Sequence, residues 1–303
     1  MNVLIADKMA PNVVDQLEAL GCTITLEPSL KDDALQSSLQ AHNPDVLVVR
    51  STKVNAGHID CAPSLSLIVR AGAGVNTIDL DHASAKGVYV ANCPGKNAAA
   101  VAELTMGHML NADRRIADNV AALKAGQWQK KVFAKGSRGV RGRTMGIIGM
   151  GAIGQAVATR AHAFGMVVVA FDPALDADKA RALSITALSS MVEVAAQADV
   201  LTVHVGLNEH TRGMINREVL SALKDGATFI NTSRGPVVDE EALTWAIQTK
   251  QIKAGLDVFC GEPPADGAWN TALAGLPGVY GTHHIGASTD EASEAVGDEV
   301  VRI

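Results

Sequence analysis

The chain has 303 residues, 48% of them hydrophobic and 19% charged, with a formal net charge of −6 at pH 7. That length allows two domains of about 100–200 residues each. The negative charge and the absence of a Lys/Arg cluster argue against nucleic acid as the main partner, and no apolar run reaches the roughly 18 residues of a membrane span.

The first seven residues read directly as a buried strand, with no basic region or cleavage site before it. We therefore expect a cytoplasmic protein. The cysteines are widely spaced and form no C-x-x-C pair, which predicts reduced thiols rather than disulfides, and no metal site. They are Cys22, Cys61, Cys93 and Cys260.

The first half of the chain alternates short apolar runs with helical patterns, which is typical of parallel sheets with crossover helices. The runs at 3–6, 23–26, 46–49, 67–70 and 88–91 predict strands, and the stretches 12–20, 32–41 and 79–86 predict helices.

A long alanine-rich pattern over 98–120 predicts a connecting helix, followed by a polar loop at 126–142. Six further strands are predicted at 144–148, 167–171, 200–204, 228–231, 255–258 and 279–281. The last pattern, 290–303, is helical but stops without a capping signal. Either that helix frays, or the natural chain continues and this is a fragment.

The strand at 144–148 runs into Gly149-x-Gly151-x-x-Gly154, and a helical run follows. Asp172 ends the next apolar run, eighteen residues after the last glycine. The glycines allow a tight turn, close approach of a pyrophosphate and close packing of the helix on the strand. With strand, helix and acid in place, the pattern predicts dinucleotide binding rather than an ordinary glycine-rich turn.

We therefore expect an α/β protein with two doubly wound parallel-sheet domains. A Rossmann cofactor domain, residues 98–284, is inserted into a flavodoxin-like substrate-binding domain formed by residues 1–97 and 285–303.

Three predicted strands are followed by Arg234, Glu262 and His284. Arginine offers a planar fork of donors to a carboxylate, and histidine exchanges protons near neutral pH. A nearby glutamate would orient the imidazole and favour its charged form. Each residue alone could be an ordinary surface group, and the adjacent His283 could compete for the histidine's role. Together they suit hydride transfer from a 2-hydroxy acid.

Seven segments resemble the D-isomer-specific 2-hydroxyacid dehydrogenase family, most closely its phosphoglycerate dehydrogenase branch. The segments follow the family's order along the chain: RSTKV at 50–54, RAGAGVN at 70–76, NAAAVAE at 97–103, GMGAIG at 149–154, TSRG at 232–235, DVF at 257–259 and HIGAST at 284–289.

The resemblance implies that Arg234 binds the substrate carboxylate, that His284 is the general acid/base and that Glu262 pairs with it. His283 stands where the family usually has proline, and we treat it as a neighbour. Gly206 and Pro236 also depart from the pattern without removing a functional group.

The resemblance also implies an NAD site. Asp172 would accept the adenine-ribose hydroxyls and repel a 2′-phosphate. The remaining cofactor contacts would come from Gly149, Gly151, Ala152, Ile153, Gly154, Val205, Thr232, Ser233, Asp257, Gly286 and Ala287, with Asp257 at the nicotinamide carboxamide.

On the substrate side, the backbone of residues 72–75 would bind a carboxylate, and two basic side chains could meet a phosphate. Ordinary exposed charges are the alternative for that basic pair. The implied substrate residues are Arg50, Ser51, Lys53, Gly72, Ala73, Gly74, Val75 and Asn97, together with Arg234 and His284.

The resemblance favours NAD-dependent oxidation of 3-phospho-D-glycerate to 3-phosphohydroxypyruvate, the entry to serine synthesis. Reduction of hydroxypyruvate, glyoxylate or another small 2-keto acid is the first alternative, and a non-catalytic NADH-sensing protein is the second. Family members pair through the connecting helix, so we expect a homodimer through the cofactor domains, centred on residues 98–120 and the Trp128 loop.

Overall fold

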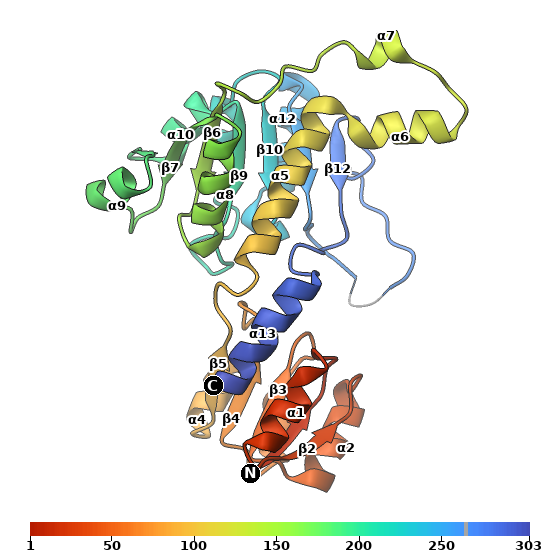
Figure 1. The fold of residues 1–303 in the computed structure, drawn as a ribbon, viewed down its shortest axis with the longest axis vertical. Helices are drawn as coiled ribbons and strands as arrows, with labels where there is room; N and C mark the ends of the chain where they lie inside the picture. The colour runs from red at the N-terminus through yellow and green to blue at the C-terminus, as the bar shows by residue number, and fades with distance from the viewer. Residues whose placement is uncertain (264–265) are drawn as a thin grey trace. The chain divides into compact units, whose positions relative to one another are not determined.

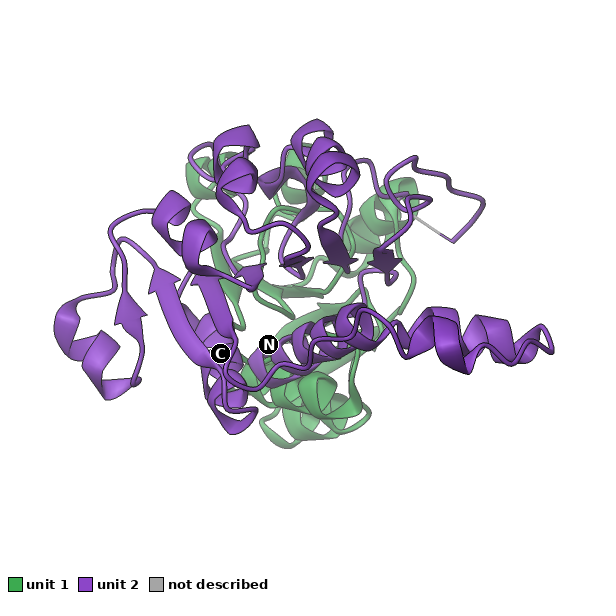
Figure 2. Cartoon of the chain, turned by 90° about the horizontal axis from the view of Figure 1, so that it is seen from above, with its two compact units in different colours: residues 1–97, 287–303 green, residues 98–286 purple. Residues whose placement is uncertain are grey.

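A computed structural model describes residues 1–263 and 266–303. The chain forms two compact units, one of residues 1–97 and 287–303, the other of residues 98–286 (Figure 2). The sequence predicted the second domain boundary at 284/285, whereas the two compact units divide at 286/287. The reason is that the backbone N–H groups of Ile285 and Gly286 donate to the Asp257 carboxylate, at 2.9 and 2.8 Å, and hold both residues in the second unit.

The first unit is built on a five-stranded parallel sheet of order β2-β1-β3-β4-β5 (Figure 1). Apolar clusters cover both faces of the sheet, as in a doubly wound fold of the flavodoxin type. Its strands are β1 (Asn2–Ile5), β2 (Thr23–Leu26), β3 (Val46–Val49), β4 (Leu67–Arg70) and β5 (Tyr89–Asn92), and its helices are α1 (Asn12–Ala19), α2 (Asp32–His42), α3 (Ala56–Asp60), α4 (Leu80–Ala85) and α13 (Asp290–Arg302).

The second unit contains a seven-stranded parallel sheet of order β12-β11-β10-β9-β6-β7-β8. This is the Rossmann order with one strand added at the β12 edge, and it confirms the predicted fold class. The strands are β6 (Thr144–Ile148), β7 (Val167–Phe171), β8 (Thr186–Ala187), β9 (Val200–Val203), β10 (Thr228–Asn231), β11 (Lys253–Leu256) and β12 (Val279–Gly281). Strand β8 was not predicted, because two residues are too short to show a pattern.

Helices cover both faces of this sheet. They are α8 (Ala152–Ala163), α9 (Ala177–Ala182), α10 (Met191–Gln197), α11 (Arg217–Ala222) and α12 (Glu240–Lys250), with a short 3-10 turn η1 (Gly235–Val237). Because all seven strands are parallel, the residues that follow each strand gather at one edge of the sheet. That edge carries the glycine-rich turn, Asp172, Arg234, Asp257 and His284.

The predicted connecting helix is two helices, α5 (Ala98–Arg114) and α6 (Ile116–Lys124), because Arg115 adopts a left-handed conformation with φ +50°. Helix α5 packs against α8 and the sheet, whereas α6 and α7 (Lys130–Phe133) form an arm with no buried residues (Figure 1). In the described part of the chain, no helix is both long and apolar enough to cross a membrane.

Candidate active site

The glycine-rich turn leaves β6 and enters α8. Gly149 has φ +93°, and a Cβ there would lie 2.4 Å from the His204 carbonyl oxygen. A Cβ at Gly154 would lie 2.1 Å from the Gly149 carbonyl oxygen, whereas a Cβ at Gly151 would meet no protein atom within 4 Å. Two glycines are therefore required by packing, and the third leaves open space at the start of α8. The first turn of that helix, Ala152 and Ile153, presents backbone N–H groups to this space.

Asp172 lies directly beyond β7 and joins the glycine-rich turn to that strand. One carboxylate oxygen accepts from the Met150 N–H at 2.7 Å, and the other accepts from the Ala174 N–H at 2.8 Å. Val205, just beyond β9, lies against the turn: a Cβ at Gly149 would be 2.9 Å from its Cγ1. Both residues thus contact the glycine-rich turn from the strands on either side of β6.

The segment after β10 is shaped by Asn231, to which the sequence gave no role. Its side-chain oxygen accepts from the Ser233 N–H and hydroxyl, at 2.9 and 2.8 Å, and its amide donates to the Arg234 carbonyl at 2.9 Å. The Thr232 hydroxyl bonds the buried Thr105 hydroxyl of α5 at 2.9 Å. These bonds fix the backbone from which the half-buried Arg234 side chain projects.

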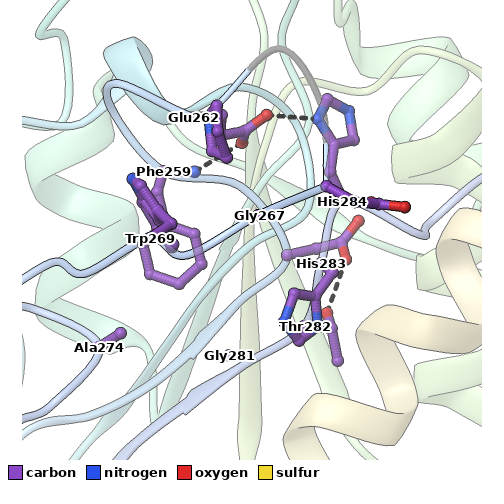
Figure 3. Close-up of a pocket in the computed structure, with 12 residues that line it drawn as sticks. Phe259, Glu262, Gly267, Trp269, Ala274, Gly281, Thr282, His283 and His284 are labelled. Atoms are coloured by element: carbon purple, nitrogen blue, oxygen red, sulfur yellow. Dashed lines mark hydrogen bonds and ion pairs between the residues drawn. The ribbon is translucent and has the colours of Figure 1, made fainter.

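Glu262 and His284 form a direct pair (Figure 3). His284 Nδ1 lies 2.7 Å from Glu262 Oε2, and the other carboxylate oxygen accepts from the Phe259 N–H at 2.8 Å. Burial alone would raise the pKa of Glu262, but these hydrogen bonds and the positive charges of His284 and Arg234 hold that pKa below its ordinary value. The ionised carboxylate accepts a hydrogen bond from Nδ1–H, so the opposite nitrogen, Nε2, is the one that can exchange a proton with a ligand.

His284 has φ +52°, a left-handed conformation that is uncommon outside glycine. Asp257 holds it there. The Asp257 carbonyl accepts from the His284 N–H at 2.8 Å, and its buried carboxylate accepts from the Thr282 hydroxyl at 2.6 Å as well as from Ile285 and Gly286. The carboxylate that was predicted to meet a nicotinamide is therefore engaged by three donors of its own chain. Any cofactor contact would use its remaining lone pairs.

A pocket of about 740 Å³ opens beside the histidine–glutamate pair, entirely within the second unit. The Phe259 and Trp269 rings both line it, and they make an edge-to-face contact with their ring centroids 5.2 Å apart. His283 also lines this pocket, while His284 alone of the two is bonded to Glu262. The lining residues are Asp257, Phe259, Glu262, Pro263, Asp266, Gly267, Trp269, Ala274, Gly281, Thr282, His283 and His284 (Figure 3).

The predicted substrate residues up to Asn97 lie in the first unit, and Asp7 organises the first group of them. Its carboxylate accepts from the backbone N–H groups of Arg50, Ser51 and Thr52, at 2.6 to 3.0 Å, and from the Ser51 hydroxyl at 3.0 Å. Burial opposes ionisation, but these donors lower the pKa of Asp7. Lys53 is exposed on the same loop. Asp7 follows β1 closely, and that strand-end position was the available signal for it.

Hydrogen bonds from β5 and the residue after it hold the loop at 72–75: the Asn92 amide donates to the Ala73 carbonyl at 2.6 Å, and the Cys93 N–H donates to the Gly72 carbonyl at 2.9 Å. The Arg70 guanidinium covers Gly72 so closely that a Cβ there would lie 1.6 Å from Nη1. Arg70 belongs to a segment that was noted in the sequence without a role for this side chain. Gly74 and Val75 complete the loop. The buried Asn97 side-chain oxygen has no hydrogen-bond partner among the residues that the structure describes.

The described residues contain no disulfide bond and no group of side chains that could bind a metal ion. All four cysteines are free, and in residues 1–263 and 266–303 no group of three or more His, Cys, Asp or Glu side chains is arranged to hold a metal ion.

A Rossmann sheet with this glycine-rich turn, and with an imidazole–carboxylate pair and an arginine at its strand ends, is the arrangement expected of the dinucleotide-dependent dehydrogenase class. Sequence comparison agrees. The profile of the D-isomer specific 2-hydroxyacid dehydrogenase, NAD binding domain, matches residues 106–286. The chain belongs to this family, and its cofactor is NAD.

Two relatives of this chain are named for different substrates. The chain is 43% identical over 297 residues to the hydroxypyruvate reductase of Thermotoga maritima, covering 97% of this chain and 93% of that protein. It is 40% identical over 299 residues to the D-3-phosphoglycerate dehydrogenase of Methanocaldococcus jannaschii, covering 98% of this chain and 55% of that protein. The chain thus spans about half the length of that phosphoglycerate dehydrogenase.

Solved structures extend the likeness to the fold. The holo form of D-mandelate dehydrogenase from Rhodotorula graminis matches with a TM-score of 0.89 and 26% identity, over 99% of this chain and 92% of that one. D-Lactate dehydrogenase from Aquifex aeolicus, complexed with NAD and lactic acid, matches with a TM-score of 0.83 and 29% identity, over 99% and 93%. The predicted family, fold and cofactor are confirmed.

Proposed function

We propose that this chain oxidises 3-phospho-D-glycerate to 3-phosphohydroxypyruvate with NAD, the reaction that opens serine synthesis. The observation that carries the reaction class is the 2.7 Å pair of His284 and Glu262, with Arg234 close enough to lower the pKa of that glutamate. The phosphorylated substrate is supported by the basic side chains of Arg50 and Lys53, on the loop that Asp7 holds. It is also supported by the relative from Methanocaldococcus jannaschii.

The chain fits NAD through its glycine-rich turn, where Gly151 leaves open space that a pyrophosphate could enter. Ala152 and Ile153 would meet the phosphates, Asp172 the adenine ribose, and Thr232 and Ser233 the nicotinamide side. When bound, NAD supplies the acceptor for the substrate's hydride.

The protein's own residues would manage the charge and the proton. Arg234 binds the substrate carboxylate with its planar fork and orients the carbon that loses hydride. His284 Nε2 takes the hydroxyl proton as the C–O bond becomes a carbonyl, and Glu262 stabilises the resulting imidazolium. In the reductive direction the same imidazolium returns the proton to the carbonyl oxygen.

A second substrate class is equally compatible with this site. The relative from Thermotoga maritima is a hydroxypyruvate reductase and matches along nearly its whole length. Reduction of hydroxypyruvate, glyoxylate or another small 2-keto acid would use the same three residues and would leave the Arg50 side chain without a phosphate to bind.

A steady-state assay with 3-phospho-D-glycerate, hydroxypyruvate and glyoxylate separates the two, using wild type, Arg50→Ala and Lys31→Ala as an exposed control from the same unit. If Arg50 binds phosphate, its removal lowers kcat/KM for phosphoglycerate about 10–100-fold, the worth of one charge-assisted hydrogen bond. The small acids and the control variant should stay within about 3-fold. Wild-type turnover of the small acids alone would refute the phosphoglycerate proposal.

His284→Asn tests the reaction class itself. It should reduce turnover of every substrate by about 100-fold or more, the usual contribution of a general acid/base, while NADH still binds. NADH binding with no turnover of any substrate by the wild type would instead favour the non-catalytic NADH-sensing alternative.

We also propose that two copies pair through the arm of the second unit. Helices α6 and α7 bury none of their residues, and large apolar side chains are exposed along them and the loop between them: Ile116, Val120, Leu123, Trp128 and Val132. Exposed apolar side chains gathered in one segment in this way are costly in water and typical of a protein–protein interface. A second copy of the chain, presenting the same surface, is the occupant that symmetry favours.

A further inference from the structure

Helix α5 brings a buried histidine beneath the catalytic segment. His108 is 4% exposed, and its Nε2 lies 3.1 Å from the Thr282 hydroxyl, two residues before His284. Nothing in the sequence pattern of α5 marks this residue, because a histidine at a helical core position is usually there for packing. Here it has a polar contact that leads to the active site.

The directions of the hydrogen bonds can be assigned from the number of protons. The Thr282 hydroxyl has one proton, and it donates that proton to Asp257 Oδ1 at 2.6 Å. The hydroxyl must therefore accept from His108, so His108 carries hydrogen on Nε2. Burial lowers the pKa of His108 despite the nearby charge of Asp257, which favours the neutral ring in that single tautomer.

The His108 side chain packs closely against strand β11. A Cβ at Gly255 of β11 would lie 2.7 Å from His108 Cβ and 3.0 Å from Cγ. Strand β11 therefore accommodates the histidine only because residue 255 is glycine. This close packing brings Nε2 within hydrogen-bond distance of Thr282.

The other end of the chain of bonds is the backbone of His284. The Asp257 carboxylate that accepts from Thr282 also accepts from Ile285 and Gly286, and the Asp257 carbonyl accepts from the His284 N–H. These bonds flank the left-handed φ of +52° at His284. A backbone in this region persists only where its surroundings hold it.

We propose that His108 is a positioning residue for His284, acting through Thr282 and Asp257. By donating to Thr282 it directs the threonine's proton to Asp257, and so keeps the carboxylate aligned with the segment that carries the catalytic imidazole. The role as a positioning residue for catalysis rests on the proposed function of His284. The structural link itself does not.

Two pairs of variants test the link. His108→Leu keeps much of the volume but removes the donor, whereas His108→Gln can place an amide N–H near the position of Nε2. Thr282→Val keeps the shape of the threonine and removes the hydroxyl. His162→Leu is the matched control, because His162 is a helical histidine of the same unit whose ring bonds the Leu183 carbonyl instead.

The first readout is the NMR spectrum of the histidine rings, with the His284 signals assigned from His284→Asn. His108→Leu and Thr282→Val should shift or broaden the His284 ring signals, and His108→Gln and the control should leave them as in wild type. Unchanged His284 signals in both His108→Leu and Thr282→Val would overturn the proposal. This readout needs no substrate, so it judges the link even if the proposed function fails.

The second readout is kinetic, with whichever of phosphoglycerate, hydroxypyruvate and glyoxylate the wild type converts. His108→Leu should lower kcat about 10–100-fold, as removal of an outer hydrogen-bond partner commonly does, with KM for the cofactor within about 2-fold. His108→Gln should recover most of the loss. Equal losses in both His108 variants would show that the residue acts only by packing, as would additive losses in His108→Leu/Thr282→Val.

Discussion

Replacing Gly154 with alanine should damage both stability and cofactor binding, because the new Cβ would point at main-chain atoms. That Cβ would lie 2.1 Å from the Gly149 carbonyl oxygen, and ordinary contact begins at 3.4 Å. Helix α8 would have to move away from the turn by 3.4 − 2.1 = 1.3 Å. No rotamer change can relieve the clash, because the obstacle is backbone.

The energetic cost has two parts of opposite sign. Overpacking of this kind costs up to about 3 kcal/mol, and the better helix propensity of alanine returns up to about 1 kcal/mol. The net loss of about 2 kcal/mol corresponds to a fall in Tm of about 4–8 °C for a unit of this size. Such a movement of α8 would also break a hydrogen bond that the start of the helix would donate to a bound phosphate. That loss weakens NADH binding about 10–100-fold.

Gly151→Ala is the matched comparison, since it adds the same methyl group one helical turn away. A Cβ there meets no protein atom within 4 Å, and the residue's φ of −69° suits alanine. Its Tm should therefore stay within about 2 °C of wild type. NADH should nevertheless bind about 10-fold or more weakly, because the methyl group enters the space that a pyrophosphate needs.

The assay is a thermal melt without cofactor and a fluorescence titration with NADH, on wild type and both variants. A Gly154→Ala protein with wild-type Tm and affinity would refute the helix-contact reasoning. Tight NADH binding by Gly151→Ala would show that the cofactor does not approach the turn as the fingerprint implies.

Two further predictions concern other parts of the second unit. Burial lowers the pKa of His204 to about 3, while the unfolded chain takes up that proton near pH 6.5, so stability is lost as pH falls below 6.5. Between pH 7 and 5.5 this single group should lower the free energy of unfolding by about 1.3 kcal/mol. Measured by urea denaturation, the free energy of unfolding of His204→Gln should fall less steeply with decreasing pH, by that same amount. Equal slopes in the two proteins would contradict this account. On the arm, Leu123→Glu should convert a dimer to a monomer, as measured by light scattering. Leu20→Glu, at an exposed position of the first unit, should leave the dimer intact. A monomeric wild type would contradict the proposed pairing.

The sheets could be predicted from the sequence because a strand buried on both faces is a continuous apolar run, as in residues 46–49 and 200–203. The break between α5 and α6 could not, because it depends on the left-handed φ of Arg115 in an otherwise uninterrupted helical pattern. Strand β11 also begins and ends two residues before its predicted bounds. That shift places Asp257 just beyond the strand, where its carboxylate can reach the segment after β12.

The candidate site divides in the same way. Arg234, Glu262 and His284 carry chemistry that is recognisable by residue type and by position after a strand. Asp7 and Thr282 are common residues, and what distinguishes them is a hydrogen bond to a residue far along the chain. Asn231 is equally common, and it acts by bonding its near neighbours Ser233 and Arg234.

His108 makes the point most sharply, since 174 residues separate it from Thr282. No periodicity or motif spans such a distance, because the contact exists only once α5 has packed against the sheet. Catalytic groups can therefore be recognised from local sequence, but the hydrogen bonds that orient them are products of the tertiary fold. The geometry of the proposed acid/base, His284, would therefore depend on helix α5, which lies roughly 180 residues earlier in the sequence.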